Sequence, residues 1–357
     1  NEMDIGIIGE GETTIVELFK LYLKTGKFER GGLRNINGIV FREKGKIVLT
    51  PKRKPILPLD KIPLPARDLM TIGKTTAMLT SRGCPYRCTF CASSRFWNKV
   101  RFFSARYVVQ EIKHLFENYQ VNHISFWDDL FVADRERLKK IYTLLKKEGL
   151  LGQLSFSGSV RSNLVDEELA QLLSKMNFQG VTMGLESASP PVLKYLKGST
   201  INVDQHTRAL RILNRHGIKP SASFIIGSPH ETRAEILQTL KFIKKSPLHS
   251  FDTYVLTPLP GTPVWEHAKE KGLVGQNMDW STLDVDFTQN HKKAVILSEK
   301  LTRRELYRLF KKFKREQKRR LIVYALKNSQ KIPKYLAGAM RRKLHGHLSR
   351  VRRSALP

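Results

Sequence analysis

Short apolar runs alternate with amphipathic stretches from about residue 76 onward. The runs predict buried strands at 77–80, 123–127, 154–159, 180–185, 220–226 and 250–256. Between them, apolar residues recur with a helical period near 104–118, 134–148, 166–176, 202–216 and 231–245. Strands separated by such helices pair in parallel through right-handed crossovers. The pattern predicts an α/β fold, a partial (β/α)6 TIM-like barrel, in which ligands bind at the carboxyl ends of the strands.

Local signals mark the ends of several of these helices. Asp134 and Asp166 are suited to cap helix starts, and Gly149 and Gly217 are suited to follow helix ends. The segments outside the barrel have other patterns. Residues 29–75 predict a β-hairpin followed by a proline-rich extended linker, with the hairpin turn at Glu43-Lys44-Gly45. Residues 299–350 predict basic helices with an apolar face.

The amino-terminal residues predict a strand, a tight turn and a helix. The apolar run Ile5–Ile8 leads into Gly9-Glu10-Gly11-Glu12, and a helical pattern follows to about residue 28. A lone unit of this kind cannot bury its apolar face. Because the chain starts at Asn1 rather than Met, we expect it to be an N-terminally truncated or processed form.

The charge of the chain is strongly positive and unevenly spread. It has 63 Lys and Arg against 32 Asp and Glu, a formal net charge of +31, and residues 301–357 contribute +17 of it. Such a segment can bind nucleic acid or an anionic membrane surface, or it can be a solvated helix face. No run approaches 18 consecutive apolar residues, so no membrane span is expected.

The chain has three cysteines, Cys84, Cys88 and Cys91, in a C-x3-C-x2-C pattern after the first predicted strand. An odd, clustered set is a poor disulfide framework, which indicates a reducing compartment such as the cytoplasm and a metal site. Three thiolates on one loop can bind three irons of a 4Fe-4S cluster. A structural zinc site needs four ligands, and neither His114 nor His123 is close in sequence to this loop.

This cysteine pattern, with Phe90 just before the last cysteine, resembles the radical S-adenosylmethionine (SAM) superfamily over about residues 74–275. The resemblance implies that Cys84, Cys88 and Cys91 bind the cluster and that its open iron binds the amino and carboxylate groups of SAM. It implies reductive cleavage of SAM to a 5′-deoxyadenosyl radical, with Phe90 near the adenine. It also implies an electron donor such as flavodoxin or ferredoxin.

The ends of the second and third strands offer further SAM contacts. Asp128 and Asp129 lie where many family members have a Gly-Gly-Glu motif that binds the SAM ammonium group. This sequence lacks those glycines, so the resemblance does not say which aspartate has that role, and an acidic helix cap is the alternative. Arg161 follows the third strand and is suited to bind a carboxylate, with a surface salt bridge as the alternative.

The ends of the fourth and fifth strands complete the predicted SAM site. Glu186 is a candidate acceptor for the SAM ammonium group or ribose, assisted by Ser187. Gly227 would let the backbone approach the adenine closely. Three isolated histidines are predicted to be structural or surface residues, and they are His206, His216 and His230.

Several stretches resemble the cobalamin-binding branch of this superfamily, among them "GEGETT", "GLESAS" and "PLPGTPVWE". Its members have a Rossmann-like cobalamin domain before the barrel. The resemblance implies that Gly9, Glu10 and Gly11 come close to cobalamin in the full-length protein, whereas the fragment would bind it poorly. The predicted regions are a cobalamin-domain remnant at 1–28, a hairpin and linker at 29–75, the barrel at 76–285 and a basic helical region at 286–357.

The branch implies methyl transfer to an unactivated carbon or phosphorus centre of a small-molecule or lipid substrate. Ring formation or rearrangement linked to cobalamin is one alternative, and a tRNA-modifying methylthiotransferase is another. The methylthiotransferases have three further cysteines, which this chain lacks, so nucleic acid is the less favoured partner. A non-catalytic iron–sulfur electron-transfer module is the alternative outside enzymes. The basic carboxyl-terminal helices suggest peripheral docking of a cytoplasmic protein on an anionic membrane.

Overall fold

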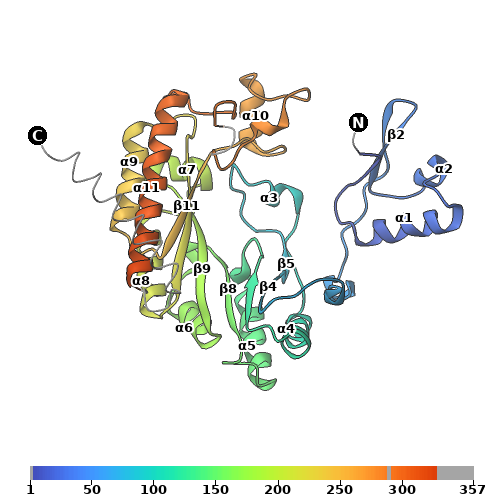
Figure 1. Cartoon of the computed structure of the whole chain (residues 1–357), viewed down its shortest axis with the longest axis horizontal. Helices are drawn as coiled ribbons and strands as arrows, with labels where there is room; N and C mark the ends of the chain where they lie inside the picture. The colour runs from blue at the N-terminus through green and yellow to red at the C-terminus, as the bar shows by residue number, and fades with distance from the viewer. Residues whose placement is uncertain (1–2, 288–290, 328–357) are drawn as a thin grey trace, which may run out of the picture. The chain divides into compact units, whose positions relative to one another are not determined.

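The structure is a computed structural model that describes residues 3–287 and 291–327 (Figure 1). The chain divides into two compact units. The first contains the described residues of Asn1–Val160 together with Leu164–Val181 and His216–Ile218. The second contains Arg161–Asn163, Thr182–Arg215 and the described residues of Lys219–Pro357.

The six predicted barrel strands are all present. They are β4 (Thr75–Met78), β7 (His123–Phe126), β8 (Ser155–Val160), β9 (Phe178–Glu186), β10 (Lys219–Ile226) and β11 (Ser250–Val255). They form one six-stranded sheet in the order β11-β10-β9-β8-β7-β4, which is also their order along the chain. The pairs β4–β7, β7–β8 and β10–β11 are parallel. This confirms the predicted α/β fold of the partial-barrel kind.

The five predicted barrel helices are present as α4 (Ala105–Tyr119), α5 (Arg135–Lys147), α6 (Glu167–Lys175), α8 (Val203–Arg215) and α9 (Arg233–Lys245). Their ends follow the local signals in the sequence. Asp134 caps α5 and Asp166 caps α6, each accepting a hydrogen bond from a backbone N–H of the first turn. Gly149 and Gly217 have φ of +68° and +74° just beyond α5 and α8, a conformation that glycine adopts without strain.

Other elements were not predicted. The longer ones are α7 (Pro190–Lys197) and α10 (Pro263–Glu270). Shorter ones are β5 (Ser81–Arg82), α3 (Ser93–Phe96), β6 (Arg101–Phe102) and the 3-10 turns Leu59–Lys61, Arg67–Leu69, Phe131–Ala133, Ser162–Leu164 and Trp280–Thr282. Among these, β5 and β6 matter most for function, because they bracket the cysteine loop.

The amino-terminal residues form a small layer of their own within the first unit. It consists of β1 (Ile5–Ile7), α1 (Glu12–Thr25), α2 (Arg30–Leu33), β2 (Ile39–Glu43) and β3 (Lys46–Leu49). The predicted hairpin is confirmed, and β1 adds to it in an antiparallel sheet of order β1-β2-β3. Leu18, Leu33, Ile36, Ile39 and Phe41 form the buried core beneath the sheet. Ile5 packs against this core, whereas Ile7 on the same strand is 38% exposed.

Aromatic side chains fill the core of the first unit under β7 and β8. Phe126 stacks on Phe131 with ring centroids 4.2 Å apart, and it lies 5.4 Å from Phe156 and 6.0 Å from Phe178. These rings are almost entirely buried. Burying each large apolar side chain stabilises the fold by about 1.5–3 kcal/mol, and the cluster keeps the ends of these strands fixed.

The helix α11 (Arg303–Lys327) lies along β11 and α9 in the second unit (Figure 1). Leu306, Leu309, Phe310 and Phe313 form its buried face, as the predicted apolar stripe requires. The rest of the predicted basic helical segment, residues 328–350, lies outside the described residues. Within the described part of the chain, none of the helices combines the length and apolar character that a membrane crossing requires.

Candidate functional site

The three cysteines lie on one loop whose ends are joined by the short β5–β6 sheet. In this sheet Arg82 lies opposite Arg101, which closes the loop 83–100 at its base. The loop follows β4, the first strand of the six-stranded sheet, as predicted. Within it, the backbone N–H of Cys91 donates to the carbonyl of Cys88 at 3.3 Å. None of the three thiols is in a disulfide bond, and all three are partly buried.

The thiols of this loop influence one another electrostatically. Burial raises the pKa of the Cys84 thiol, and a backbone hydrogen bond at Tyr86 opposes that effect in part. The negative charges of Cys88, Asp129 and Cys91 raise the pKa of Cys84 further. Bound iron would relieve this repulsion, because thiolates bind metal in their deprotonated form.

The donor set fits the cysteine ligands of an iron–sulfur cluster. Three thiolates from one short loop can bind three irons of a cubic cluster and leave the fourth without a protein ligand. In residues 3–287 and 291–327, no group of three or more His, Cys, Asp or Glu side chains already has a metal-binding arrangement. The fit therefore rests on donor type and on the placement of the loop after β4.

Asp128 and Asp129, at the end of β7, lie in different surroundings. Asp128 is 2% exposed, and its carboxylate accepts hydrogen bonds from the N–H and hydroxyl of Thr80 and from the hydroxyl of Ser81. Burial raises the pKa of Asp128, and these hydrogen bonds offset the rise only in part. Asp129 is exposed and accepts a hydrogen bond from the Ser93 hydroxyl at 2.5 Å. Of the two, Asp129 is the one that a ligand can reach.

The Gly9–Glu12 turn contacts the base of the cysteine loop through the carboxylate of Glu10. Its Oε1 accepts hydrogen bonds from Arg82 Nη1 and, at 2.8 Å, from Arg101 Nη2. Its Oε2 accepts from Arg101 Nη1 at 3.0 Å and from the backbone N–H of Ile56 at 2.7 Å. Burial would raise the pKa of Glu10, but the hydrogen bonds from Arg101, Ile56 and Arg82 outweigh burial and hold it below its ordinary value.

Further contacts surround this ion-pair cluster. Arg82 also binds the carboxylate of Glu12. The guanidinium carbons of Arg82 and Arg101 each lie 5.5 Å from the centre of the Trp97 ring, within the range of a cation–π interaction. Gly83 has φ of +94°, and a Cβ there would come within 2.9 Å of the Trp97 Cβ. The loop start thus needs glycine both for its backbone conformation and for space.

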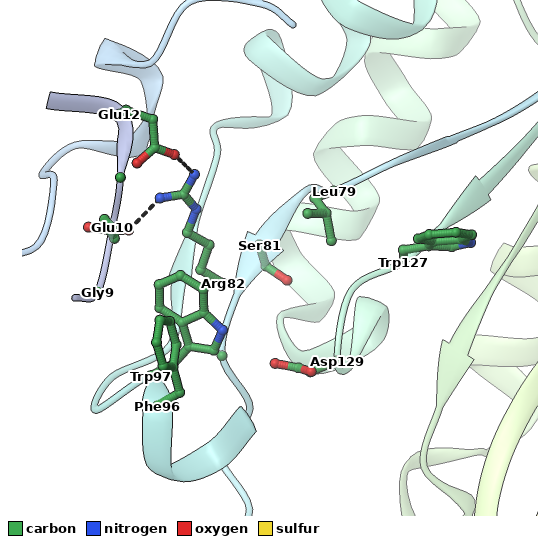
Figure 2. Close-up of a pocket in the computed structure, with 12 residues that line it drawn as sticks. Gly9, Glu10, Glu12, Leu79, Ser81, Arg82, Phe96, Trp97, Trp127 and Asp129 are labelled. Atoms are coloured by element: carbon green, nitrogen blue, oxygen red, sulfur yellow. Dashed lines mark hydrogen bonds and ion pairs between the residues drawn. The ribbon is translucent and has the colours of Figure 1, made fainter. Parts of the chain in front are cut away.

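The turn and the cysteine loop line one pocket of about 330 Å³. Its walls consist of Gly9, Glu10, Gly11, Glu12, Leu79, Ser81, Arg82, Gly83, Phe96, Trp97, Trp127 and Asp129. Figure 2 shows Glu10 and Glu12 with Arg82 on one side of the pocket, and Asp129 and Trp127 on the other. The predicted cobalamin-contact residues therefore share a cavity with Asp129. Phe90 lies partly buried on the same loop but does not line this pocket.

Glu186, at the end of β9 in the second unit, is a strained and incompletely satisfied residue. It is buried, with φ of +65°. Its Oε1 lies 3.5 Å from Lys197 Nζ, while Oε2 has no hydrogen-bond partner within the described residues. Burial raises the pKa of Glu186, which the charges of Lys197 and Arg161 partly offset. Such a carboxylate is typical of a functional site.

The other predicted residues of the second unit make contacts within the protein. Arg161 is buried, and its Nε donates to Asn163 Oδ1 at 3.0 Å. The hydroxyl of Ser187 lies 3.1 Å from that of Thr239, in a buried position. Gly227 has φ of +86°, and a Cβ there would lie 3.0 Å from Leu306 Cδ2, so its lack of a side chain serves the packing of α11. Whether these residues also contact SAM stays a prediction.

Sequence reasoning missed Lys197, which is the charged partner of Glu186. Its only sequence signal is its position next to the apolar stripe of α7. It also missed Arg82, whose signal is its place two residues before Cys84.

His206 was predicted to be structural. It is fully buried with Nδ1 2.8 Å from the Ser162 hydroxyl, and burial lowers its pKa to about 3.

Comparison with known proteins agrees with this geometry. Residues 78–243 match the Radical SAM superfamily. An uncharacterized methyltransferase of Pyrococcus horikoshii is 34% identical over 310 residues, which cover 84% of this chain and 66% of the relative. Anaerobic magnesium-protoporphyrin IX monomethyl ester cyclase of Rubrivivax gelatinosus is 28% identical over 280 residues, which cover 75% of this chain and 50% of the relative. The chain thus spans less than two thirds of these relatives.

The fold also matches solved structures of the radical SAM methyltransferase TsrM from Kitasatospora setae. One, with tryptophan substrate and a SAM analogue bound, has a TM-score of 0.66 at 17% identity and covers 86% of this chain and 67% of TsrM. Another, with cobalamin and a [4Fe-4S] cluster bound, has a TM-score of 0.62 at 18% identity and covers 82% and 62%.

A sequentially ordered βα sheet with three cysteines after its first strand defines an iron–sulfur protein of the α/β class. Residues 78–243 are a domain of the radical SAM superfamily. Its members are enzymes that use a 4Fe-4S cluster and SAM.

Proposed function

We propose that the chain catalyses the radical SAM part of a cobalamin-dependent methyl transfer to an unactivated carbon or phosphorus centre. The observation that carries this proposal is the pocket in which Asp129 and the base of the cysteine loop meet the Gly9–Glu12 turn. The methyltransferase names of two similar proteins support the reaction type, and the cobalamin bound in TsrM supports the cofactor.

The residues of the chain have separable roles in this proposal. Cys84, Cys88 and Cys91 would hold the cluster, which when bound supplies the electron that splits the sulfonium of SAM. Asp129 would accept hydrogen bonds from the SAM ammonium group, because its carboxylate is accessible on the pocket wall. Trp127 and Phe96 offer exposed aromatic faces to a flat ring system.

The first test separates a radical SAM enzyme from an electron-transfer module. The protein is reconstituted anaerobically with iron and sulfide, reduced, and given SAM, and 5′-deoxyadenosine is measured by mass spectrometry. We expect its release, and we expect the variant with all three cysteines changed to alanine to release none. A protein with a verified cluster that does not cleave SAM would contradict the proposal.

The second test addresses the reaction and its substrate class. SAM with a deuterated methyl group is supplied with cobalamin and an extract of small molecules and lipids. We expect a product that carries the labelled methyl group and is absent without cobalamin. Cyclised or rearranged products without the deuterated methyl group would favour ring formation, the reaction type named for the similar cyclase of Rubrivivax gelatinosus. Label found in tRNA would favour the nucleic-acid alternative.

Two further features of the proposal concern partners. A small electron carrier such as flavodoxin or ferredoxin would reduce the cluster, and it can replace the chemical reductant in the first test. A protein with a reducible cluster and clustered cysteines that form no disulfide is suited to the cytoplasm. Carrier-dependent 5′-deoxyadenosine release would support this assignment, and release with dithionite but with neither carrier would count against it.

The helix α11 supports peripheral binding to an anionic membrane. Its exposed basic residues from the second turn onward are Arg308, Lys311, Lys312, Arg315, Lys318 and Arg319. Exposed Leu321, Tyr324 and Leu326 follow on the same helix, and such a combination suits the lipid headgroup layer. We expect sedimentation with phosphatidylglycerol vesicles that weakens when Lys312 and Lys318 become glutamate. Salt-sensitive RNA binding without vesicle binding would overturn this interpretation.

A further inference from the structure

Both ends of the cysteine loop carry an arginine, and both arginines bind one carboxylate. Arg82 and Arg101 lie directly opposite each other in the antiparallel β5–β6 pair. Opposite residues in such a pair project to the same face, where like charges destabilise the pair. The carboxylate of Glu10 accepts hydrogen bonds from both guanidinium groups. An anion from another segment therefore neutralises the base of the loop.

These three charges are shielded from water. The side chains of Glu10, Arg101 and Arg82 are 6%, 10% and 15% exposed. Trp97 lies 5.5 Å from each guanidinium group. Water and salt therefore screen the repulsion between the two arginines poorly.

Both carboxylate oxygens of Glu10 accept hydrogen bonds from donors within the protein. Oε1 binds the two arginines, and Oε2 binds Arg101 and the backbone N–H of Ile56. Arg101 also donates to the Ile56 carbonyl at 3.0 Å, so the linker is drawn into the same cluster. A carboxylate with this many partners is poorly suited to contact a cofactor.

We propose that Glu10 is a positioning residue for the cysteine loop. By neutralising Arg82 and Arg101 it keeps the base of the loop closed, and this sets the place of Cys84, two residues beyond Arg82. The inference rests on the proposed function, because the loop is taken to hold a cluster. It gives Glu10 a task at the cluster loop in place of the predicted cobalamin contact.

The charge balance at the base of the loop suggests a second substitution that should reverse the effect of Glu10→Gln. In the wild type, Glu10 and Glu12 balance Arg82 and Arg101. Glu10→Gln leaves one positive charge in excess, whereas Glu10→Gln combined with Arg101→Gln restores neutrality through the remaining Arg82–Glu12 pair. A role in loop closure therefore predicts that the second substitution repairs the first.

The test begins with the metal-free protein. Alkylation of Cys84 by iodoacetamide is followed by peptide mass spectrometry, together with hydrogen exchange over residues 81–102. For Glu10→Gln we expect roughly tenfold faster alkylation and faster exchange, because both report the opening of the loop. The double variant should return toward wild type. The control Glu43→Gln removes the Arg34 pair in the hairpin, outside the pocket, and should behave as wild type.

The second measurement is iron bound per chain after anaerobic reconstitution, with the electron paramagnetic resonance signal of the reduced cluster. We expect Glu10→Gln to retain a small fraction of the wild-type iron and the double variant to retain most of it. If Glu10→Gln does not fold, Glu10→Asp keeps the charge but shortens the side chain, and we expect it to be alkylated faster than the wild type, whereas an alkylation rate equal to that of the wild type would count against the positioning role.

The outcomes separate this inference from the proposed function. If the wild type binds no iron, the proposed function is wrong. The alkylation rates of Cys84 in the wild type and Glu10→Gln still decide the role of Glu10. A wild type that binds iron, with Glu10→Gln equal to it in alkylation and iron content, overturns the positioning role. If Glu10→Gln loses cobalamin affinity while its alkylation and exchange rates equal those of the wild type, the predicted contact of Glu10 with cobalamin is supported instead.

Discussion

The carboxylate of Asp128 binds the backbone N–H of Thr80 through both of its oxygens, at 3.0 and 3.2 Å. This contact joins the end of β7 to the residues that lead into the cysteine loop. It uses the acceptor capacity of Asp128 inside the protein, and it leaves Asp129 on the pocket wall. Two adjacent aspartates thus have different tasks, one structural and one available to a ligand.

Asparagine substitutions should separate these tasks. Asp129→Asn should weaken SAM binding to the cluster-loaded protein by roughly tenfold, because a charge-assisted hydrogen bond is lost, and should change the unfolding free energy by less than about 0.5 kcal/mol. Asp128→Asn should instead lower the unfolding free energy by about 1–3 kcal/mol, because its amide cannot accept from all of the same donors. Equilibrium dialysis and urea denaturation measure the two effects. Unaltered SAM binding in Asp129→Asn would remove it from the site.

Gly83 should be intolerant of a side chain. A Cβ there would lie 2.9 Å from the Trp97 Cβ and 3.1 Å from the Lys99 carbonyl oxygen. Gly149 has a similar positive φ but open space around it, so it isolates backbone strain from steric clash. We expect Gly149→Ala to cost about 1 kcal/mol of unfolding free energy and Gly83→Ala about 1–3 kcal/mol more. Equal losses in urea denaturation would show that Trp97 adjusts without cost.

Glu231 should make the second unit less stable as the pH rises. Burial raises its pKa to about 8, although the N–H groups of Gly227 and Ser228 donate to its Oε2. The unfolded chain releases this proton above the ordinary value of 4.5, whereas the folded chain keeps it up to about 8. Folding is therefore disfavoured by about 1.4 kcal/mol for each pH unit across this window.

The variant Glu231→Gln cannot ionise and should lack this dependence. We expect its stability to gain on the wild type steadily as the pH rises from about 5 to 8, and to exceed it at the upper end. Urea denaturation of both proteins at several pH values measures the difference. Parallel pH profiles would mean that Glu231 is already ionised in the folded protein.

The fold was largely predictable because its signals are local. Apolar periodicity located the six strands, and Asp134 and Asp166 marked two helix starts within a residue. The helices α7 and α10 were missed for a physical reason. Each begins at a proline, Pro190 or Pro263, which resembles a loop signal although proline is well tolerated in a first helical turn.

The site was only partly predictable, because its contacts are long-range. The three cysteines predicted to bind the cluster were found from their spacing on one loop and from the family resemblance. The contrast between the two aspartates depends on Thr80, which lies 48 residues from Asp128. The partner of Glu10 at Arg101 lies 91 residues away. No pattern along the chain encodes which acid meets which base, so Glu10 could only be assigned to the turn in which it stands.

His206 offers the last prediction, and its pH dependence has the opposite sign to that of Glu231. Burial lowers the pKa of His206 from 6.5 to about 3, and the charge of Lys197 adds to the effect. As the pH falls below 6.5, this histidine becomes protonated in the unfolded chain but stays neutral in the folded chain. The folded state therefore loses about 1.4 kcal/mol per pH unit between 6.5 and about 3.

The variant His206→Gln should be less stable than the wild type near neutral pH by about 1–3 kcal/mol, because the contact with the Ser162 hydroxyl is disturbed in a buried site. This deficit should shrink as the pH falls, since glutamine does not titrate and only the wild type loses stability through this position. The surface variant His230→Gln controls for general effects of removing a histidine. Urea denaturation between about pH 7 and pH 4 gives the comparison. A deficit that stays constant over this range would show that His206 accepts its proton inside the folded protein, and that the cluster around Lys197 tolerates a further positive charge.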